Sequence, residues 1–250
     1  MEYKLDFPFK LVYQPEMDST SRVLRQWCEE GRIDEYTVVV TDFQTAGRGQ
    51  RGNTWESEKG KNLMFSLLLT PTFLSANKQF LLSQIASLAI KDVIELYCKE
   101  VSVKWPNDIY WRDKKICGML IEHALQGPEL SYTIVGIGLN INQEIFHSPA
   151  PNPISLYQVT KIKHDAPAIL RQVLDRLLFY YEKLRNGDEA FIPNLYYHAL
   201  FRRNQLAFYK DKEGVFEGRI VRVEPSGLLV LQRNDGSERA YAFKEIAYVL

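Results

Sequence analysis

The chain has 250 residues, of which 46% are hydrophobic and 25% are charged, an ordinary globular composition. This length suits one core of medium size plus a small second domain, and the composition excludes disordered, collagen-like and coiled-coil proteins. Lysine plus arginine and aspartate plus glutamate both total 31, so the formal net charge is zero. Without a global basic field we expect no DNA partner, and any anion site must be local.

The sequence predicts neither a membrane protein nor a secreted one. The apolar run at 63–69 is far shorter than the roughly 18 residues needed to span a bilayer. The start of the chain lacks the basic and apolar regions of a secretion signal. Cys28, Cys98 and Cys117 are widely separated and suggest neither disulfides nor a zinc site, so we expect a cytoplasmic location. The four histidines show no ligand spacing and are not expected to be catalytic.

The first elements are one short helix and two strands. A serine or threonine at 19–20 can cap a helix that runs to Cys28, and Gly31 ends it. The apolar run at 37–43 predicts a buried strand, and the run at 63–69 predicts the next.

The middle of the chain predicts a helix followed by consecutive strands. Apolar residues recur at three- and four-residue steps from 77 to 98, which indicates a helix with one core-facing stripe. Strand candidates follow at 101–105, 115–125 and 132–142. Short turns between consecutive strands imply antiparallel pairing. We therefore expect an α+β fold with a mixed sheet flanked by helices.

The last third predicts helices and then a small β domain. Residues 148–153 carry three prolines and indicate an irregular connection, and a helix is expected at 165–185 before Gly187. A further helix, broken near Pro193, is expected to reach Leu200. Beyond it, period-2 runs indicate a small barrel or sandwich at 206–210, 216–224, 228–232 and 239–243. These patterns predict two domains, 1–203 and 204–250.

The first motif is the glycine-rich segment 47–52, GRGQRG, which matches the GxGxxG pattern of dinucleotide-binding folds. The segment that follows does not begin a helix, and no acidic residue stands about 20 residues on, so that interpretation fails. Three glycines let a backbone approach a ligand, while Arg48 and Arg51 supply planar cations for carboxylate or phosphate. A solvated basic turn is the alternative.

Three further motifs lie on or between the strands. In KWPND (104–108), Pro-Asn suits a tight turn, while Asn107 and Asp108 suit a nucleotide and a metal-bound phosphate. Lys115 is either a solvated strand residue or a cation beside the open space above Gly118. The glycines of GIGLNIN (136–142) indicate either a bulge or a flat strand beneath a planar ligand.

Taken in order, these motifs resemble the biotin protein ligases: Ser19-Thr20, QTAGRGQRGNTW (44–55), KWPND (104–108), KICG (115–118) and GIGLN (136–140). The resemblance implies a catalytic domain related to the lipoate ligases, followed by an SH3-like barrel. About 18 residues precede Ser19, so it further implies the monofunctional type, without an N-terminal DNA-binding domain.

The implied reaction has two steps. Biotin and ATP give biotinyl-5′-AMP and pyrophosphate, and a lysine of a biotin carboxyl carrier domain of a biotin-dependent carboxylase then takes the biotin. Biotin would be bound by Ser19, Thr20, Ser21, Gln44, Gly47, Arg48, Gly49, Gln50, Lys115 and Gly118. ATP would be bound by Arg48, Arg51, Trp55, Asn107, Asp108, Lys115 and Asn140.

Within these sets the resemblance implies special roles for three side chains. Lys115 and Arg48 would be catalytic by stabilising developing negative charge, and Asp108 would hold Mg²⁺ on a phosphate. Two positions depart from the family pattern: Ser21 stands where asparagine is frequent, and Gln50 where a further arginine is frequent. Retention of the adenylate would then depend more on Arg48 and Arg51.

Two other functions remain open from the sequence. A lipoate ligase also activates a carboxylate with ATP, but the polar set Ser19, Thr20 and Gln44 and the C-terminal barrel favour biotin. A catalytically silent biotin or nucleotide sensor would not need the charges of Arg48, Asp108 and Lys115 together.

Overall fold

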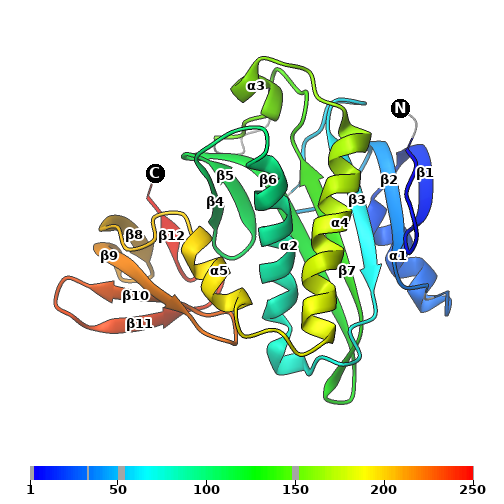
Figure 1. Cartoon of the computed structure of the whole chain (residues 1–250). Helices are drawn as coiled ribbons and strands as arrows, with labels where there is room; N and C mark the ends of the chain where they lie inside the picture. Colours follow the sequence, from blue (N-terminus) through cyan, green and yellow to red (C-terminus); the bar gives the residue numbers. More distant parts are fainter. Residues whose placement is uncertain (1–2, 33, 50–53, 148–151, 250) are drawn as a thin grey trace.

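The computed structural model describes residues 3–32, 34–49, 54–147 and 152–249. Figure 1 shows a large sheet covered by helices and a smaller all-β part at the C-terminal end. In this part of the chain the large sheet has seven strands in the order β1-β2-β3-β7-β6-β5-β4. β1 and β2 pair in parallel and the other neighbours are antiparallel, so the predicted mixed sheet is confirmed.

The strands of the large sheet are β1 (Lys10–Met17), β2 (Thr37–Gln44), β3 (Leu63–Leu69), β4 (Val101–Lys104), β5 (Asp108–Trp111), β6 (Lys114–Gln126) and β7 (Glu129–Leu139). The helices are α1 (Thr20–Glu29), α2 (Phe80–Ile94), α3 (Leu156–Thr160), α4 (Ala166–Arg185) and α5 (Ile192–Ala199), with a 3₁₀ turn, η2 (Ala76–Lys78).

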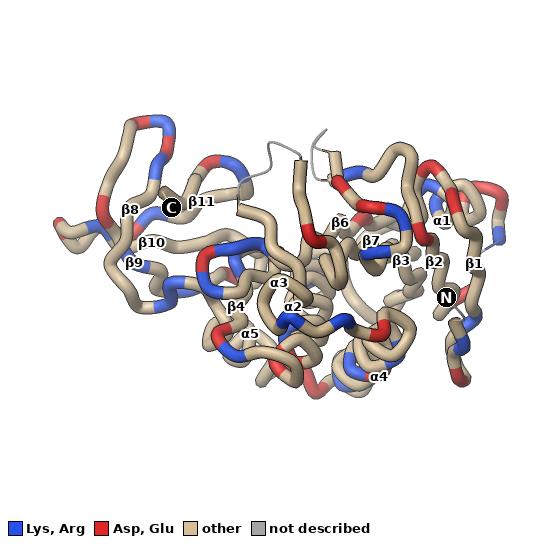
Figure 2. Tube along the Cα trace, turned by 90° about the horizontal axis from the view of Figure 1, so that it is seen from above, with Lys and Arg blue, Asp and Glu red and all other residues tan. Residues whose placement is uncertain are grey.

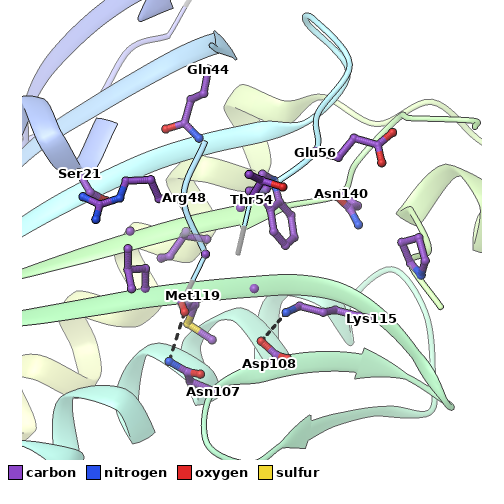
Figure 3. A pocket seen from close by; sticks show the side chains of 18 of the residues that line it. Ser21, Gln44, Arg48, Thr54, Glu56, Asn107, Asp108, Lys115, Met119 and Asn140 are labelled. Carbon is purple, nitrogen blue, oxygen red and sulfur yellow. Dashed lines mark hydrogen bonds and ion pairs between the residues drawn. The ribbon is translucent and has the colours of Figure 1, made fainter. Parts of the chain in front are cut away.

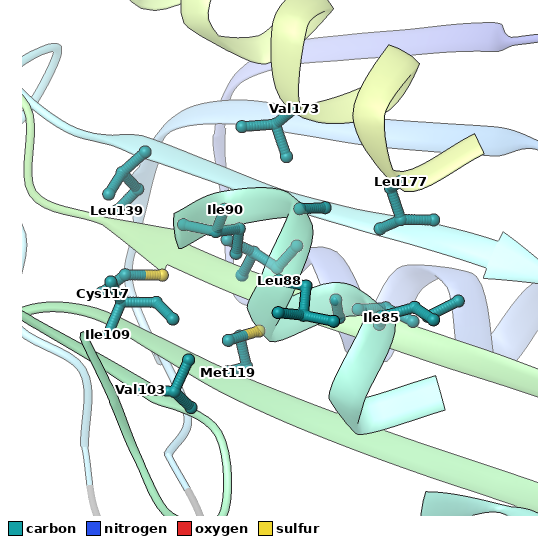
Figure 4. Packing of buried hydrophobic residues seen from close by; sticks show 14 of the residues in the cluster. Ile85, Leu88, Ile90, Val103, Ile109, Cys117, Met119, Leu139, Val173 and Leu177 are labelled. Atoms are coloured by element: carbon teal, nitrogen blue, oxygen red, sulfur yellow. The ribbon is translucent and has the colours of Figure 1, made fainter. Parts of the chain in front are cut away.

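Period-2 alternation gives the sheet two different faces. One face packs against α2 and α4, where Ile85 and Ile90 of α2 lie between the sheet and Val173 of α4 (Figure 4). The other face packs in part against α1, through a smaller cluster that includes Leu24 and Ile134. Alternate residues of β3, β6 and β7 therefore point away from the main core, toward the side that carries α1.

A second sheet follows α5, in the order β11-β10-β9-β8-β12. Its strands are β8 (Ala207–Asp211), β9 (Gly214–Val223), β10 (Leu229–Arg233), β11 (Glu238–Tyr241) and β12 (Ala247–Tyr248), all paired antiparallel. This arrangement agrees with the predicted small C-terminal β domain of the SH3-like kind. Figure 2 shows acidic and basic residues interspersed along the trace, as the zero net charge leads one to expect.

Most predicted elements are confirmed, and the differences have local causes. The helix expected at 77–98 is α2, which ends at Ile94, with η2 before it. β1 was not predicted because its sequence carries Pro15, which is tolerated at a sheet edge but weakens the strand pattern. β5, four residues that directly follow the turn at 105–107, was not predicted. Ser19 occupies the N-cap of α1 with extended backbone, but its side chain makes no capping hydrogen bond.

His123 lies on β6 opposite Thr133 of β7, and its Nδ1 is 2.9 Å from the Thr133 hydroxyl. Burial lowers the pKa of His123 to about 4. The folded protein thus binds fewer protons than the unfolded chain between about pH 4 and 6.5. The stability that this neutral histidine contributes is complete above pH 6.5 and is lost as the pH falls through that window.

We predict that the free energy of unfolding falls between pH 6.5 and 4, with His123 contributing up to about 3 kcal/mol. Urea titrations of wild-type protein and the His123→Gln variant across this range measure that contribution. The free energy of unfolding of the variant should fall less steeply with decreasing pH. An equal pH dependence in both proteins would contradict the role given to His123.

Candidate active site

A cavity of about 600 Å³ opens on the side of the large sheet that faces away from α2 and α4. Residues from α1, β2, the loop after it, β4 to β7 and the second sheet line it. The residues predicted from sequence that line this cavity are Ser19, Thr20, Ser21, Gln44, Arg48, Gly49, Trp55, Asn107, Asp108, Lys115, Gly118 and Asn140. Segments more than 100 residues apart in sequence therefore meet around one space.

One end of the cavity is built from uncharged polar groups. The first turn of α1 places Thr20 and Ser21 there, both nearly buried, and the end of β2 places Gln44 beside them. The backbone N–H of Thr20 donates to Gln44 Oε1 over 2.9 Å, and the Thr20 hydroxyl is 3.2 Å from the same oxygen. In Figure 3 Ser21 and Gln44 lie on the opposite side of the pocket from Lys115.

The floor of the cavity consists of glycines on β6 and β7, and the Trp55 indole lies on it. A Cβ added to Gly138 would lie 2.4 Å from Trp55 Cε2, and one on Gly118 would lie 2.7 Å from Trp55 Cζ3. The two glycines are paired across the sheet. The glycine strand is therefore flat rather than bulged at this point, and the indole of Trp55 covers it where a planar ligand was predicted. Within the described residues the Trp55 Nε1 is buried and has no hydrogen-bond partner.

The charged end of the cavity contains Lys115 and Asp108. Lys115 Nζ is 2.8 Å from Asp108 Oδ1, and both side chains are about one-third exposed, at 30% and 28%. A register shift between β5 and β6 places Ile109 opposite Cys117 and Tyr110 opposite Lys115, which is a bulge.

That bulge decides which way the lysine points. Ile116 and Cys117 are consecutive, yet both side chains are in the main core, so the side chains of β6 do not alternate regularly between the two faces here. Lys115 therefore lies on the cavity side together with Gly118. Its Nζ is 3.1 Å from the point where a Gly118 Cβ would stand, so the lysine lies beside Gly118 as expected, and the Trp55 ring and the lysine side chain fill the space above the glycine.

A second lysine, Lys104 at the end of β4, was not predicted as a site residue. It lines the cavity, donates to the Tyr110 hydroxyl over 3.0 Å and lies 5.0 Å from the centre of the Tyr248 ring. Burial lowers the pKa of the Lys104 ammonium, and Asp108 acts in the opposite direction. Its position at the start of KWPND was the available signal, but its contact with Tyr248 joins segments far apart in sequence.

Two asparagines complete the wall. Trp105, Pro106 and Asn107 form the predicted turn between β4 and β5, and Asn107 Nδ2 lies 3.4 Å from the Met119 carbonyl oxygen. Asn140 Nδ2 donates to the Ile154 carbonyl oxygen, whereas its buried Oδ1 accepts no hydrogen bond from the described residues. A buried acceptor that faces a cavity and lacks a partner is suited to a ligand donor.

The glycine-rich loop is described only in part. Gln50 and Arg51 lie outside the described residues. Gly47 does not line the cavity but supports it, because a Cβ there would lie 2.8 Å from the Trp55 carbonyl oxygen. The Trp55 N–H donates to the Gly47 carbonyl over 3.0 Å, so the two ends of the loop are joined. Arg48 is exposed and lines the cavity, where its guanidinium can meet an anion.

Turns of the C-terminal β domain also contribute to the cavity wall, which the sequence did not predict. Phe243 lines the wall and its ring contacts that of Trp105, with centroids 6.2 Å apart. The Trp105 Nε1 donates to the Gly227 carbonyl oxygen over 2.9 Å. Further lining residues that the predictions lacked are Thr54, Glu56, Pro106, Tyr110, Met119, Leu120, Ile137, Phe146 and Pro153.

Two other observations bear on the kind of protein. Among the residues that the structure describes, no helix has the length and apolar character needed to cross a membrane. The same residues contain no cluster of three or more histidine, cysteine or acidic side chains arranged to hold a metal ion.

Comparison with known proteins shows which family the chain belongs to. Residues 13–140 match the model of the biotin/lipoate A/B protein ligase family. The biotin protein ligase of Aquifex aeolicus, solved in complex with biotin and ATP, superposes with a TM-score of 0.79 and 28% identity, covering 96% of this chain and 98% of that one.

Two curated relatives extend this likeness over most of the chain. The bifunctional ligase/repressor BirA of Bacillus spizizenii is 29% identical over 240 residues, which are 93% of this chain and 72% of that protein. The biotin--[acetyl-CoA-carboxylase] ligase of Paracoccus denitrificans is 29% identical over 80% of this chain and 85% of its own length. The chain belongs to the biotin/lipoate A/B protein ligase family.

Proposed function

We propose that this protein is a biotin protein ligase, an enzyme that activates biotin with ATP and transfers it to a protein lysine. The proposal is carried by one observation: a single cavity has an uncharged polar end and, opposite it, a charged end that contains the Lys115 ammonium. Biotin has the matching shape, a polar ureido ring joined by an apolar chain to a carboxylate. The relatives that are named as biotin ligases support the same assignment.

The ligands would lie end to end in the cavity. The ureido ring of biotin would face Thr20, Ser21 and Gln44, and its chain would lead from there toward Lys115. ATP would occupy the side that Asn107, Asp108 and Asn140 line, where the free Asn140 Oδ1 accepts a hydrogen bond. This order brings the biotin carboxylate and the α-phosphate together near Lys115.

In the first step a carboxylate oxygen of biotin attacks the α-phosphorus of ATP. The bond to the bridging oxygen of the β-phosphate breaks, which gives biotinyl-5′-AMP and pyrophosphate. Negative charge increases on the phosphorus oxygens, and the Lys115 ammonium, which lies beside Gly118, stabilises it. Arg48 would hold the carboxylate and the α-phosphate from the loop, so both reactants are fixed before they react.

A magnesium ion would enter with the triphosphate, whose oxygens and water supply most of its ligands. Asp108 fits such an ion, because its carboxylate lines the cavity beside the nucleotide side. The ion supplies charge neutralisation of the phosphates when bound. Lys115 then exchanges its ion pair with Asp108 for the substrate oxygens.

In the second step the neutral amine of an acceptor lysine attacks the biotinyl carbonyl carbon, AMP leaves with the electrons of the anhydride bond, and the nitrogen loses a proton to water as the amide forms. We propose as acceptor a biotin carboxyl carrier domain of a biotin-dependent carboxylase. The enzyme has to release its product, so this contact should be small and transient.

We further propose that the reaction takes place in the cytoplasm, which supplies ATP and keeps thiols reduced. The three cysteines, Cys28, Cys98 and Cys117, are all unpaired, as such a compartment requires. We also propose a division into a catalytic domain, 1–203, and a C-terminal domain, 204–250. The change from helices to the second antiparallel sheet falls at this point, between α5 and β8.

A lipoate ligase is the second candidate, since the family includes both activities by name. The polar end separates them, because a dithiolane ring has no hydrogen-bonding groups to satisfy Thr20, Ser21 and Gln44. Pyrophosphate release on mixing the protein with ATP, Mg²⁺ and either acid tests the choice. Release with biotin and not with lipoate is expected; release with lipoate alone would assign the protein to the other activity.

We predict that Lys115→Ala lowers the rate of adenylate formation by about 10²- to 10³-fold, as loss of a preorganised charge at the reacting phosphate does. Pyrophosphate release under saturating biotin and ATP measures this rate. Lys114→Ala is the matched control, because Lys114 is the exposed neighbour on the same strand and does not line the cavity.

The expected result is normal turnover in Lys114→Ala and an intact fold in both variants, checked by circular dichroism. Normal turnover in Lys115→Ala would remove this lysine from the mechanism.

We predict that Gly138→Ala raises the KM for ATP by about tenfold or more, because overpacking at a filled site costs about 1–3 kcal/mol. The added Cβ would lie 2.4 Å from the Trp55 ring, so the indole has to leave the floor. Steady-state kinetics with ATP varied measure the effect.

Gly236→Ala provides the control, since Gly236 has φ +84° in the turn between β10 and β11 and no atom lies within 4 Å of the added Cβ. It should lower stability and leave the KM for ATP unchanged. Equal KM values in wild type and Gly138→Ala would show that Trp55 does not need the glycine floor.

A further inference from the structure

Ser66 lies behind the polar end of the cavity and has no place among the residues that line it. It is in the middle of β3, fully buried, and its side chain points to the α1 face of the sheet. Its Oγ is 2.7 Å from the Thr20 hydroxyl and 2.9 Å from the Ser21 hydroxyl. One hidden hydroxyl thus contacts both hydroxyls of the first turn of α1.

The orientation of Gln44 sets the direction of this hydrogen-bond chain. The Thr20 backbone N–H can only donate, so the Gln44 atom 2.9 Å away is the amide oxygen. The Thr20 hydroxyl gives its single proton to the same oxygen over 3.2 Å. Gln44 therefore keeps both of its N–H donors for other partners, on the side of the amide away from Thr20.

Each hydroxyl has one proton, so the order continues through the serines. If Thr20 gives its proton to Gln44, then Ser66 donates to Thr20 over the 2.7 Å that separates the two hydroxyls. Ser66 has then used its own proton, and Ser21 must donate to Ser66. Ser21 is left with acceptor lone pairs toward the cavity, while Gln44 presents donors.

We propose that Ser66 is a positioning residue that fixes this polarity and so selects a cyclic urea as the ligand group. A urea offers a carbonyl oxygen to the Gln44 donors and an N–H to the Ser21 acceptor. The proposal rests on the proposed function and goes further, because it assigns the choice between biotin and an acid without a urea to a residue that touches neither.

The space around Ser66 explains why the chain depends on it. Gly136 lies opposite Ser66 on β7, and a Cβ there would lie 2.3 Å from Ser21 Oγ and 3.5 Å from Ser66 Oγ. The glycine lets Ser21 reach the sheet surface. Without the Ser66 hydroxyl, Thr20 and Ser21 lose their common partner, and the Ser21 proton turns toward the cavity as a competing donor.

The test compares Ser66→Ala with wild type by steady-state kinetics and by calorimetric titration of biotin without ATP. Loss of two hydrogen bonds should weaken biotin binding about tenfold and raise the KM for biotin equally. The KM for ATP and the kcat should stay unchanged. Desthiobiotin keeps the urea, so its affinity for the variant should fall by the same factor as that of biotin. Ser87→Ala is the matched control, because Ser87 is equally buried but lies in α2, where it donates to the Ser83 carbonyl oxygen.

Unchanged biotin affinity in Ser66→Ala would overturn the proposal, and so would an equal rise in both KM values, which indicates general loosening. Should Ser66→Ala fail to fold, Ser66→Cys serves in its place, since it keeps the volume and weakens the hydrogen bonds. Failure of the proposed function looks different: wild-type protein would then bind no biotin at all.

Discussion

Three glycines on neighbouring strands remove the side chains from one patch of the large sheet, and the cavity depends on this. Gly118, Gly136 and Gly138 occupy positions where any Cβ would stand within 3 Å of Trp55 or of Ser21. Glycine weakens a strand interior by roughly 0.5–1 kcal/mol relative to alanine, so three of them are a cost to the sheet. The cost is offset by the pairing of β6 and β7 along their whole length and by the buried core on the opposite face.

The polar and charged ends of the cavity are held by different kinds of structure. The polar end depends on hydrogen bonds among Thr20, Gln44 and Ser66, which are buried or nearly so and therefore rigid. The charged end depends on the ion pair of Lys115 with Asp108, which is partly exposed and therefore weak. A ligand with a fixed ring and a reacting carboxylate needs this difference, because the lysine has to change partners during the reaction.

Much of the fold followed from the sequence because the strongest signals there are local. The helix at 165–185 has a proline in its first turn and Gly187, with φ +79°, after its end, and the structure has α4 at 166–185. Motif residues such as Lys115 and Asp108 were brought together as expected. The individual roles in binding biotin and ATP stay predictions.

The features that sequence reasoning missed depend on contacts between distant segments. The bulge opposite Ile109 turns Lys115 to the cavity side, and no local pattern marks it. The Lys104 ammonium lies 5.0 Å from the centre of the Tyr248 ring, which follows it by more than 140 residues. In the sequence, Ser66 is a single polar residue in an apolar strand. Its hydrogen-bond partners are on α1, and these contacts form only when α1 packs on the sheet.

Retention of the intermediate tests most directly the claim that one cavity holds both reactants end to end. The protein is mixed with biotin, ATP and Mg²⁺ without an acceptor, desalted, and weighed by native mass spectrometry. The account predicts a complex heavier by one biotinyl-5′-AMP, which dissociates to that species on denaturation. A mass increase of biotin alone, or of ATP alone, after full incubation would contradict it.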